Sequence, residues 1–240
     1  NVRNRVSVER AVEGADAVVN LVGILFEKGP QNFEAAQREG AINVAEAAKK
    51  AGVKRLVQIS AIGADEDSKS DYARTKAEAE KAVREVFPEA VILRPSIVFG
   101  PEDGFFNKFA AMASSPVSNV LPFLPAIGGG KTQLQPVYAG DVADAIAAAV
   151  NRDDVEGKTF ELGGPRVYTF KELYDFIGET IDRKRYAFPI PNFIAKPMGL
   201  TFGALWRVPP LAWGFFGAPP ITGDQVEMLK SDNVVADDAL

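Results

Sequence analysis

Residues 54–60 read Lys-Arg-Leu-Val-Gln-Ile-Ser, a short apolar run that lies between two helical patterns, at 31–51 and 72–87. Two further runs rich in β-branched residues are 16–22 (Asp-Ala-Val-Val-Asn-Leu-Val) and 90–97 (Ala-Val-Ile-Leu-Arg-Pro-Ser-Ile). A nearly continuous apolar run is typical of a strand that is covered on both faces. Because such runs alternate with helical patterns, the sequence predicts βαβ units and a parallel sheet of the α/β class.

The clearest helical pattern is 31–51, which is followed by Gly52 at the position of a C-terminal cap. A shorter helix is expected at 2–13, where Gly14 would end it. Small or apolar residues share one stripe of the longer helix, which can therefore lie close to a sheet. They are Phe33, Ala36, Gly40, Val44 and Ala48.

Local polar patterns predict how three further helices are stabilised. Asp141 is expected to cap a helix that buries Val142, Ile146 and Val150. Thr169–Glu172 has the spacing of a capping box. In the helix at 72–87, Glu80 and Arg84 are spaced as an i,i+4 ion pair.

Composition excludes several kinds of function. The chain of 240 residues has a formal net charge of −5 and contains no His and no Cys. A nucleic-acid partner is not expected, because neutralising phosphates requires clustered Lys and Arg. No metal site is predicted, because the usual Cys and His ligands of zinc are absent. Proton transfer would fall to Tyr, Lys, Ser or a carboxylate.

The sharpest chemical signal is Tyr72-Ala73-Arg74-Thr75-Lys76. Residues four apart lie on one face of a helix, so Tyr72 and Lys76 are expected to face the same way. A nearby cation stabilises phenolate, and we therefore expect Lys76 to lower the pKa of Tyr72 towards the range of acid/base catalysis. A solvated Tyr and Lys at a helix start is the alternative on this motif alone.

Five short motifs in the right order give the sequence its resemblance to the extended short-chain dehydrogenase/reductase family. They are Asn20 to Gly23, Gly52 to Val57, Tyr72 to Lys76, Leu93 to Pro101 and Gly140 to Ala143. The resemblance covers roughly residues 1–165 and implies a Rossmann-type doubly wound parallel sheet. Residues 166–240 would form a smaller C-terminal α/β region, to which 101–135, expected as loop and short helix, would contribute.

The resemblance implies which residues meet NAD or NADP. Leu21 to Gly23 would line the cofactor, Tyr72 and Lys76 would meet its nicotinamide ribose, and Asn1 and Val2 would meet adenine. For Val22, Gly23 and Val98, core packing is an equal alternative. The full predicted set is Asn1, Val2, Leu21, Val22, Gly23, Ile59, Ser60, Ala61, Tyr72, Lys76, Pro95, Ser96, Ile97 and Val98.

Two departures from the family pattern bear on activity. The glycine-rich phosphate turn of the family's first strand is not in the chain, so we expect strands one to three to precede Asn1 and the run at 16–22 to be an open apolar edge. The family's catalytic Ser or Thr falls on Ala61, which cannot hydrogen-bond a substrate. Ser60 would substitute only if the strand slipped by one residue, which would turn its side chain to the other face.

The stretch Ile221 to Val235 resembles the branch of this family found as a dehydrogenase-like accessory subunit of respiratory complex I, as do Ser60 to Asp65 and Tyr72 to Glu80. This implies NADP(H) or NAD(H) binding with little or no turnover, and a structural or assembly role beside complex I subunits or assembly intermediates. The location would be the cytoplasmic face of the inner membrane in a bacterium, or the matrix side in a mitochondrion.

A segment rich in Pro, Phe and Trp, 196–220, is the candidate docking surface for a membrane or a protein partner. Its prolines and charges interrupt it too often for a transmembrane helix. Closure of the C-terminal region over its own cleft is the alternative. The second function hypothesis is an active NAD(P)-dependent oxidoreductase or epimerase that uses Tyr72 and Lys76.

Overall fold

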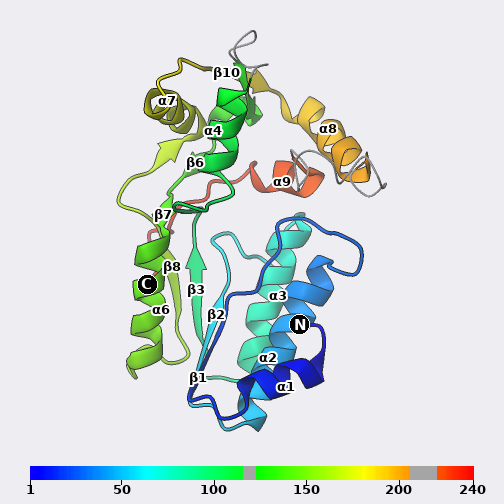
Figure 1. Ribbon diagram of the computed structural model, residues 1–240, viewed down its shortest axis with the longest axis vertical. Helices are drawn as coiled ribbons and strands as arrows, with labels where there is room; N and C mark the ends of the chain where they lie inside the picture. Colours follow the sequence, from blue (N-terminus) through cyan, green and yellow to red (C-terminus); the bar gives the residue numbers. More distant parts are fainter. Residues whose placement is uncertain (116–122, 206–220) are drawn as a thin grey trace.

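The computed structural model describes residues 1–115, 123–205 and 221–240, and Figure 1 gives its element labels. The α-helices are α1 (Arg5–Val12), α2 (Glu39–Lys50), α3 (Asp71–Val86), α4 (Phe106–Ser114), α6 (Ala139–Asn151), α7 (Phe170–Thr180), α8 (Asn192–Leu205) and α9 (Gly223–Met228). The strands are β1 (Ala17–Asn20), β2 (Arg55–Ile59), β3 (Val91–Pro95), β4 (Val98–Phe99), β5 (Phe123–Ile127), β6 (Gln133–Leu134), β7 (Val137–Tyr138), β8 (Thr159–Leu162), β9 (Tyr168–Thr169) and β10 (Tyr186–Ile190).

A four-stranded parallel sheet in the order β1-β2-β3-β8 forms the centre of the fold. Helices cover both of its faces: α1, α2 and α3 lie on one side and α6 on the other (Figure 1). Adjacent residues of β2 pack into different cores, Leu56 against the α1–α3 side and Val57 against the α6 side. Because strand side chains alternate between faces, this explains the continuous apolar run of β2. The predicted doubly wound parallel sheet is confirmed.

The outer strand β1 pairs with β2 and with no other strand in the described residues. Beyond its end, Leu21 is 65% exposed and Val22 is 37% exposed. In the described residues, the open apolar edge expected at 16–22 is therefore present along β1 and the two residues after it.

A second core lies beyond the carboxyl ends of the sheet strands, between α4, α7 and the two-stranded parallel sheet β5–β10 (Figure 1). Aromatic rings pack edge to face there, for example Phe109 against Tyr174, whose hydroxyl donates to the carbonyl of Pro125. The expectation of loop and short helix over 101–135 was wrong for β5. Despite Pro125, β5 is a strand, and it occupies an edge of its small sheet, where a missing N–H is tolerated.

Two local predictions were wrong and one was confirmed. The helix α6 begins at Ala139 after Tyr138, so Asp141 lies inside its first turn and does not cap it. Glu80 does not pair with Arg84, because Arg84 donates to Gly157 and Thr159 instead. The capping box of α7, from Thr169 to Glu172, is present.

The helix expected over 31–51 also differs from a regular α-helix. Its first part is a π-helix, η1 (Glu34–Arg38), and α2 follows directly. The predicted stripe is buried along both segments, and Gly52 has the positive φ of 70° that suits a residue just past a helix end. No helix in the described residues is long and apolar enough to cross a membrane.

A partly buried ion-pair group joins α3 to the sheet. Arg94 of β3 binds Glu80 of α3 through two hydrogen bonds of 2.9 and 2.7 Å, and its Nη1 lies 3.5 Å from Glu161 of β8. The side chains of both carboxylates are largely buried, at 9% and 12% exposure. Glu80 is therefore bonded to Arg94 of the sheet and not to Arg84 of its own helix.

We expect Arg94→Met to lower the free energy of unfolding by about 2–4 kcal/mol, because it leaves two buried carboxylates without their cation. The control is Lys171→Met, which breaks the exposed Lys171–Asp175 pair and should change stability by less than about 1 kcal/mol. Urea unfolding measures both. Equal small losses for the two variants would contradict a structural role for the Arg94 group.

Candidate functional site

The predicted site residues follow three neighbouring strands of the sheet. Residues 21–23 follow β1, residues 60 and 61 follow β2, and residues 96–98 follow β3. Because β1, β2 and β3 are parallel, these segments lie side by side at the carboxyl ends of the strands, which we call the site edge. Ligands of open α/β sheets bind outside the carboxyl ends of the strands, so this edge is the candidate site.

Lys76 of α3 reaches into this edge. Its Nζ donates to the carbonyl of Ile59 at 3.1 Å, and a Cβ placed on Gly23 would lie 3.3 Å from the same nitrogen. The residue is buried, and burial lowers the pKa of Lys76 to about 8, while the nearby Glu80 acts in the opposite direction. The ammonium of Lys76 is therefore poorly solvated and lies between the ends of β1 and β2.

Tyr72 lies one helical turn before Lys76, on the same side of α3, as predicted. Its ring packs edge to face on Phe33 with centroids 6.0 Å apart, and the Nζ of Lys76 is 5.9 Å from its ring centroid. Desolvation raises the pKa of Tyr72 to about 12, and the carboxylate of Asp224 in α9 adds to the rise. The expected lowering of this pKa was wrong, because Lys76 bonds to a backbone carbonyl while burial and Asp224 both oppose phenolate.

Ser60 and Ala61 stand at the end of β2. The backbone N–H of Ser60 donates to Leu93, which keeps the ladder of β2 and β3 in register. The hydroxyl of Ser60 is enclosed and has no hydrogen-bond partner in the described residues, whereas Ala61 is half-buried. Since the strand does not slip, Ser60 does not take the place of the missing hydroxyl at Ala61.

Gln37 is a candidate site residue that the sequence predictions did not include. It lies in η1 and is 2% exposed. Its Nε2 donates to Thr75 at 3.0 Å, and its Oε1 has no partner in the described residues. The same oxygen would be 3.7 Å from a Cβ on Gly23, so it faces the Lys76 side of the edge. A Gln beside a stripe of Ala and Gly was the available signal, and π-helical turns are frequent at functional sites.

The four predicted residues from Pro95 to Val98 differ in their surroundings. Pro95 is buried in β3, and Ser96 is buried with its hydroxyl donating to the carbonyl and side chain of Asn233. Ile97 packs against the second core, and Val98 is 38% exposed. Val98 is thus the one of these four with substantial apolar surface to offer a ligand.

Val2 lies against α2, whereas the amino group of Asn1 donates to Ser7 of α1. Asn43 donates to the carbonyl of Val2, and the side chain of Val2 packs against Gly40 at the α1–α3 core. None of the described interactions links either residue to Lys76. Their contact with adenine stays a prediction.

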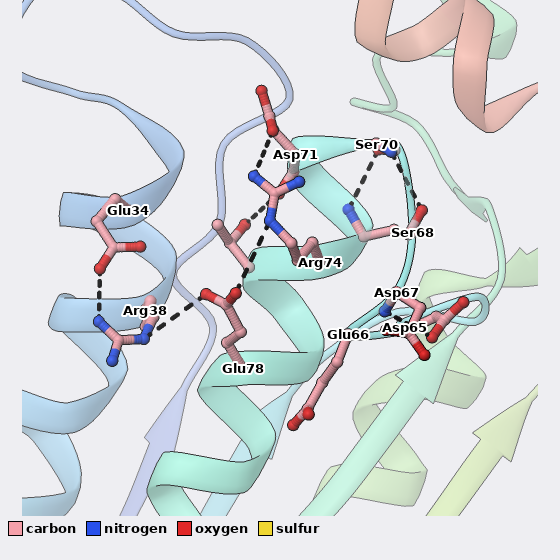
Figure 2. A network of polar contacts seen from close by, with 12 residues as sticks. Glu34, Arg38, Asp65, Glu66, Asp67, Ser68, Ser70, Asp71, Arg74 and Glu78 are labelled. Atoms are coloured by element: carbon pink, nitrogen blue, oxygen red, sulfur yellow. Dashed lines mark hydrogen bonds and ion pairs between the residues drawn. The ribbon is translucent and has the colours of Figure 1, made fainter.

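An exposed ion-pair network holds η1 and α3 together on the outside of the site (Figure 2). Arg38 binds Glu34 of its own segment and lies 3.7 Å from Glu78 of α3. Arg74 approaches the other oxygen of Glu78 at 3.8 Å and binds Asp71. The network aligns the helix that carries Gln37 with the helix that carries Tyr72 and Lys76.

These residues have the chemistry that a nicotinamide nucleotide requires. Lys76 makes one hydrogen bond in the described residues, which leaves donors for ribose hydroxyls or phosphate. Gln37 adds a buried acceptor, Gly23 leaves room for close approach of the backbone, and Leu21 and Val22 offer apolar surface. Small-molecule sites in general combine apolar walls with a few convergent polar groups, and these residues offer such a combination.

The fold is that of Rossmann-type proteins, and the sequence model of the NAD dependent epimerase/dehydratase family matches residues 1–163. That match covers more than half of the chain, which therefore belongs to this family. Among solved structures, the UDP-glucose 4-epimerase of Thermus thermophilus in complex with NAD matches 80% of the chain, and 70% of its own, with a TM-score of 0.63 and 26% identity.

Curated relatives match over nearly the whole chain. The mitochondrial NADH dehydrogenase [ubiquinone] 1 alpha subcomplex subunit 9 of Arabidopsis thaliana is 39% identical over 99% of this chain and 58% of its own length. The protein of the same name from Rattus norvegicus is 36% identical over 98% of this chain and 59% of its own length. The chain thus spans somewhat more than half the length of these relatives.

The buried ammonium makes stability depend on pH. Because the pKa of Lys76 falls from an ordinary 10.5 to about 8, the unfolded chain binds the proton more tightly between these values. The free energy of unfolding of the wild type, relative to Lys76→Met, should therefore rise between pH 8 and 10, by about 2 kcal/mol. Urea unfolding at several pH values measures it. A difference that does not vary with pH would mean that Lys76 keeps an ordinary pKa.

Proposed function

We propose that this protein binds NADP(H) or NAD(H) with little or no turnover and serves a structural or assembly role in respiratory complex I. The observation that carries the proposal is at the end of β2. Ala61 stands where the family has its catalytic hydroxyl, and the only neighbouring hydroxyl on that strand end, Ser60, is enclosed. In this proposal the edge keeps groups that would bind a nucleotide and lacks one that would act on a substrate.

The state of Tyr72 supports binding over proton transfer. A general acid or base works best when its pKa lies near the operating pH. The pKa of Tyr72 at about 12 leaves it a neutral phenol at physiological pH. It can then donate a hydrogen bond to a ribose hydroxyl, beside the donors of Lys76.

Bound nicotinamide nucleotide would supply hydride chemistry, but in this proposal its role is to hold the site together. Lys76 and Gln37 would bind and orient it, while Leu21 and Val22 would shield its face from water. We infer NADP as the preferred form from the resemblance to the complex I branch. The partner is inferred from the names of the curated relatives, which are subunits of NADH dehydrogenase [ubiquinone].

The second candidate, an active oxidoreductase or epimerase, rests on the pair Tyr72 and Lys76 facing one another from a single helix. In an enzyme of this family the phenol would exchange a proton with the substrate. That role requires a pKa well below the present one and a hydroxyl at position 61.

Tyr72→Phe distinguishes the two candidates. We expect the wild type and Tyr72→Phe to oxidise NADPH at the same background rate with a panel of ketones, aldehydes and nucleotide sugars, since no proton transfer depends on the phenol. Lys76→Met should weaken NADPH binding by about tenfold, because it removes a charged donor. Absorbance at 340 nm and fluorescence titration measure the two effects. A wild-type rate above background that Tyr72→Phe abolishes would establish the enzyme.

We further propose that residues 1–165 form the nucleotide-binding domain and 166–240, with part of 101–135, the docking region. Of the surface expected at 196–220, residues 206–220 lie outside the described residues. The described part of α8 has one face that packs on α9, through Ala195 and Gly199. Away from this contact α8 presents Phe193, which is 76% exposed, whereas the side chain of Leu200 lies against Gly223 of α9.

We expect Phe193→Ser to lower the fraction of the protein that co-migrates with complex I, by about tenfold, because a large apolar contact is lost. Its nucleotide content should not change. Val6→Ser in α1 is the control, since it removes another exposed apolar side chain from a distant helix. Native electrophoresis with immunodetection measures the fraction. Unchanged co-migration of Phe193→Ser would remove Phe193 from the docking surface.

A further inference from the structure

A carboxylate from the C-terminal region binds the start of the helix that carries Tyr72 and Lys76. Asp224 lies in the first turn of α9, which Thr222 and Gln225 anchor through a capping box. One oxygen of Asp224 accepts from the backbone N–H of Asp71 at 2.6 Å. The other accepts from the hydroxyl of Ser70 at 2.9 Å and from the N–H of Tyr72 at 3.3 Å. Figure 1 places α9 at this end of α3.

These bonds complete the N-terminus of α3. The first N–H groups of a helix have no partners inside it, and together they attract negative charge. In α3, Ser70 itself accepts from the N–H groups of Ala73 and Arg74. Asp224 accepts from the two N–H groups that precede these, on Asp71 and Tyr72. A residue more than 150 positions away thus supplies half of the helix cap.

The same C-terminal segment makes a second attachment at the site edge. The side chain of Asn233 donates to the carbonyl of Ile62, just beyond β2, and accepts from the hydroxyl of Ser96, just beyond β3. The backbone of Asn233 forms hydrogen bonds with Gln133 and Gln135, which flank Leu134 of the second core. Residues 222–233 therefore run across the ends of α3, β2 and β3, and we call them the C-terminal strap.

The strap is also joined to the proposed docking helix. Gly199 of α8 comes so close to α9 that a Cβ there would lie 2.8 Å from the backbone of Thr222 and Gly223. Lys196 of α8 lies 3.5 Å from Glu227 of α9. A continuous set of contacts thus leads from α8 through α9 and Asp224 to Tyr72.

We propose that Asp224 is a positioning residue for nucleotide binding, which it supports by holding the start of α3 so that Tyr72 and Lys76 face the edge of the sheet. This rests on the proposed function. Asp224 does not itself reach the edge in this account. It acts through the backbone of Asp71 and Tyr72.

The expected rise in Kd depends on the fraction of molecules in which the first turn of α3 is ordered. Without the carboxylate, the N–H groups of Asp71 and Tyr72 lose their partner, and the first turn of α3 spends more time frayed. A ligand that binds only the ordered form has an apparent Kd equal to the intrinsic Kd divided by the ordered fraction. If about one molecule in ten keeps the ordered turn, affinity falls about tenfold.

The experiment measures the Kd for NADPH by fluorescence titration of the complete gene product after removal of bound nucleotide. Asp224→Asn should raise Kd about tenfold, since it loses the charge and one acceptor oxygen. Asp224→Glu, which keeps a carboxylate, should restore most of the affinity. Ser70→Ala reaches the same contact from α3 and should weaken binding in the same direction. Circular dichroism establishes that each variant is folded.

Glu227→Gln is the matched control, because it removes a charge from the same helix, where Glu227 pairs with Lys196 and Lys230 and not with α3. Its Kd should equal that of the wild type. An unchanged Kd for Asp224→Asn, or equal weakening by Glu227→Gln, would overturn the inference while leaving the proposed function intact. A wild type that binds no nicotinamide nucleotide would contradict the proposed function itself, and the inference with it.

Discussion

The hydrogen bonds between Asp224 and the first turn of α3 connect the site edge to the C-terminal strap. On one side lies the helix with Tyr72 and Lys76, and on the other lies the strap, which leads from α9 to the second core. Helix N-termini attract anions, and here the anion comes from the chain itself. Because Asp224 is itself partly desolvated, which raises its pKa, the contact depends on the three donors that face it. The site edge and the C-terminal region are therefore built as one unit.

Desolvation decides the chemical character of the site. Burial moves the pKa of Lys76 down to about 8 and that of Tyr72 up to about 12, so both shifts favour the neutral forms. At neutral pH the phenol of Tyr72 is neutral and the ammonium of Lys76 is still mostly protonated, so both can donate hydrogen bonds to ribose hydroxyls. In the proposed function these two residues bind the nucleotide, and no hydroxyl at position 61 completes a proton relay to a substrate. A protein that keeps its nucleotide as a structural ligand needs no more than this.

Much of this was predictable from local sequence. Apolar runs predicted β1, β2 and β3, and the pattern is clearest for β2 and β3, which are buried on both faces. The motif from Tyr72 to Lys76 lies in the predicted helix α3. Two predictions failed where distant residues decide the outcome: Arg94 binds Glu80 in place of Arg84, and β5 forms despite Pro125 because β10 pairs with it. The cap expected at Asp141 failed for a local reason, because α6 begins two residues earlier. Gln37 and Asp224 were missed because only the fold brings Gln37 beside Lys76 and Asp224 to the start of α3.

The central claim is that the nucleotide is a tightly held structural ligand, and its most direct test is the nucleotide content of the complete protein as purified. The protein is denatured, the released nucleotide is identified by mass spectrometry, and exchange with added labelled NADP(H) is followed on the same preparation. The account predicts about one NADP(H) or NAD(H) per chain that exchanges slowly and is not oxidised by added carbonyl compounds. Protein that contains no nucleotide, or one that exchanges rapidly and is consumed, would contradict it.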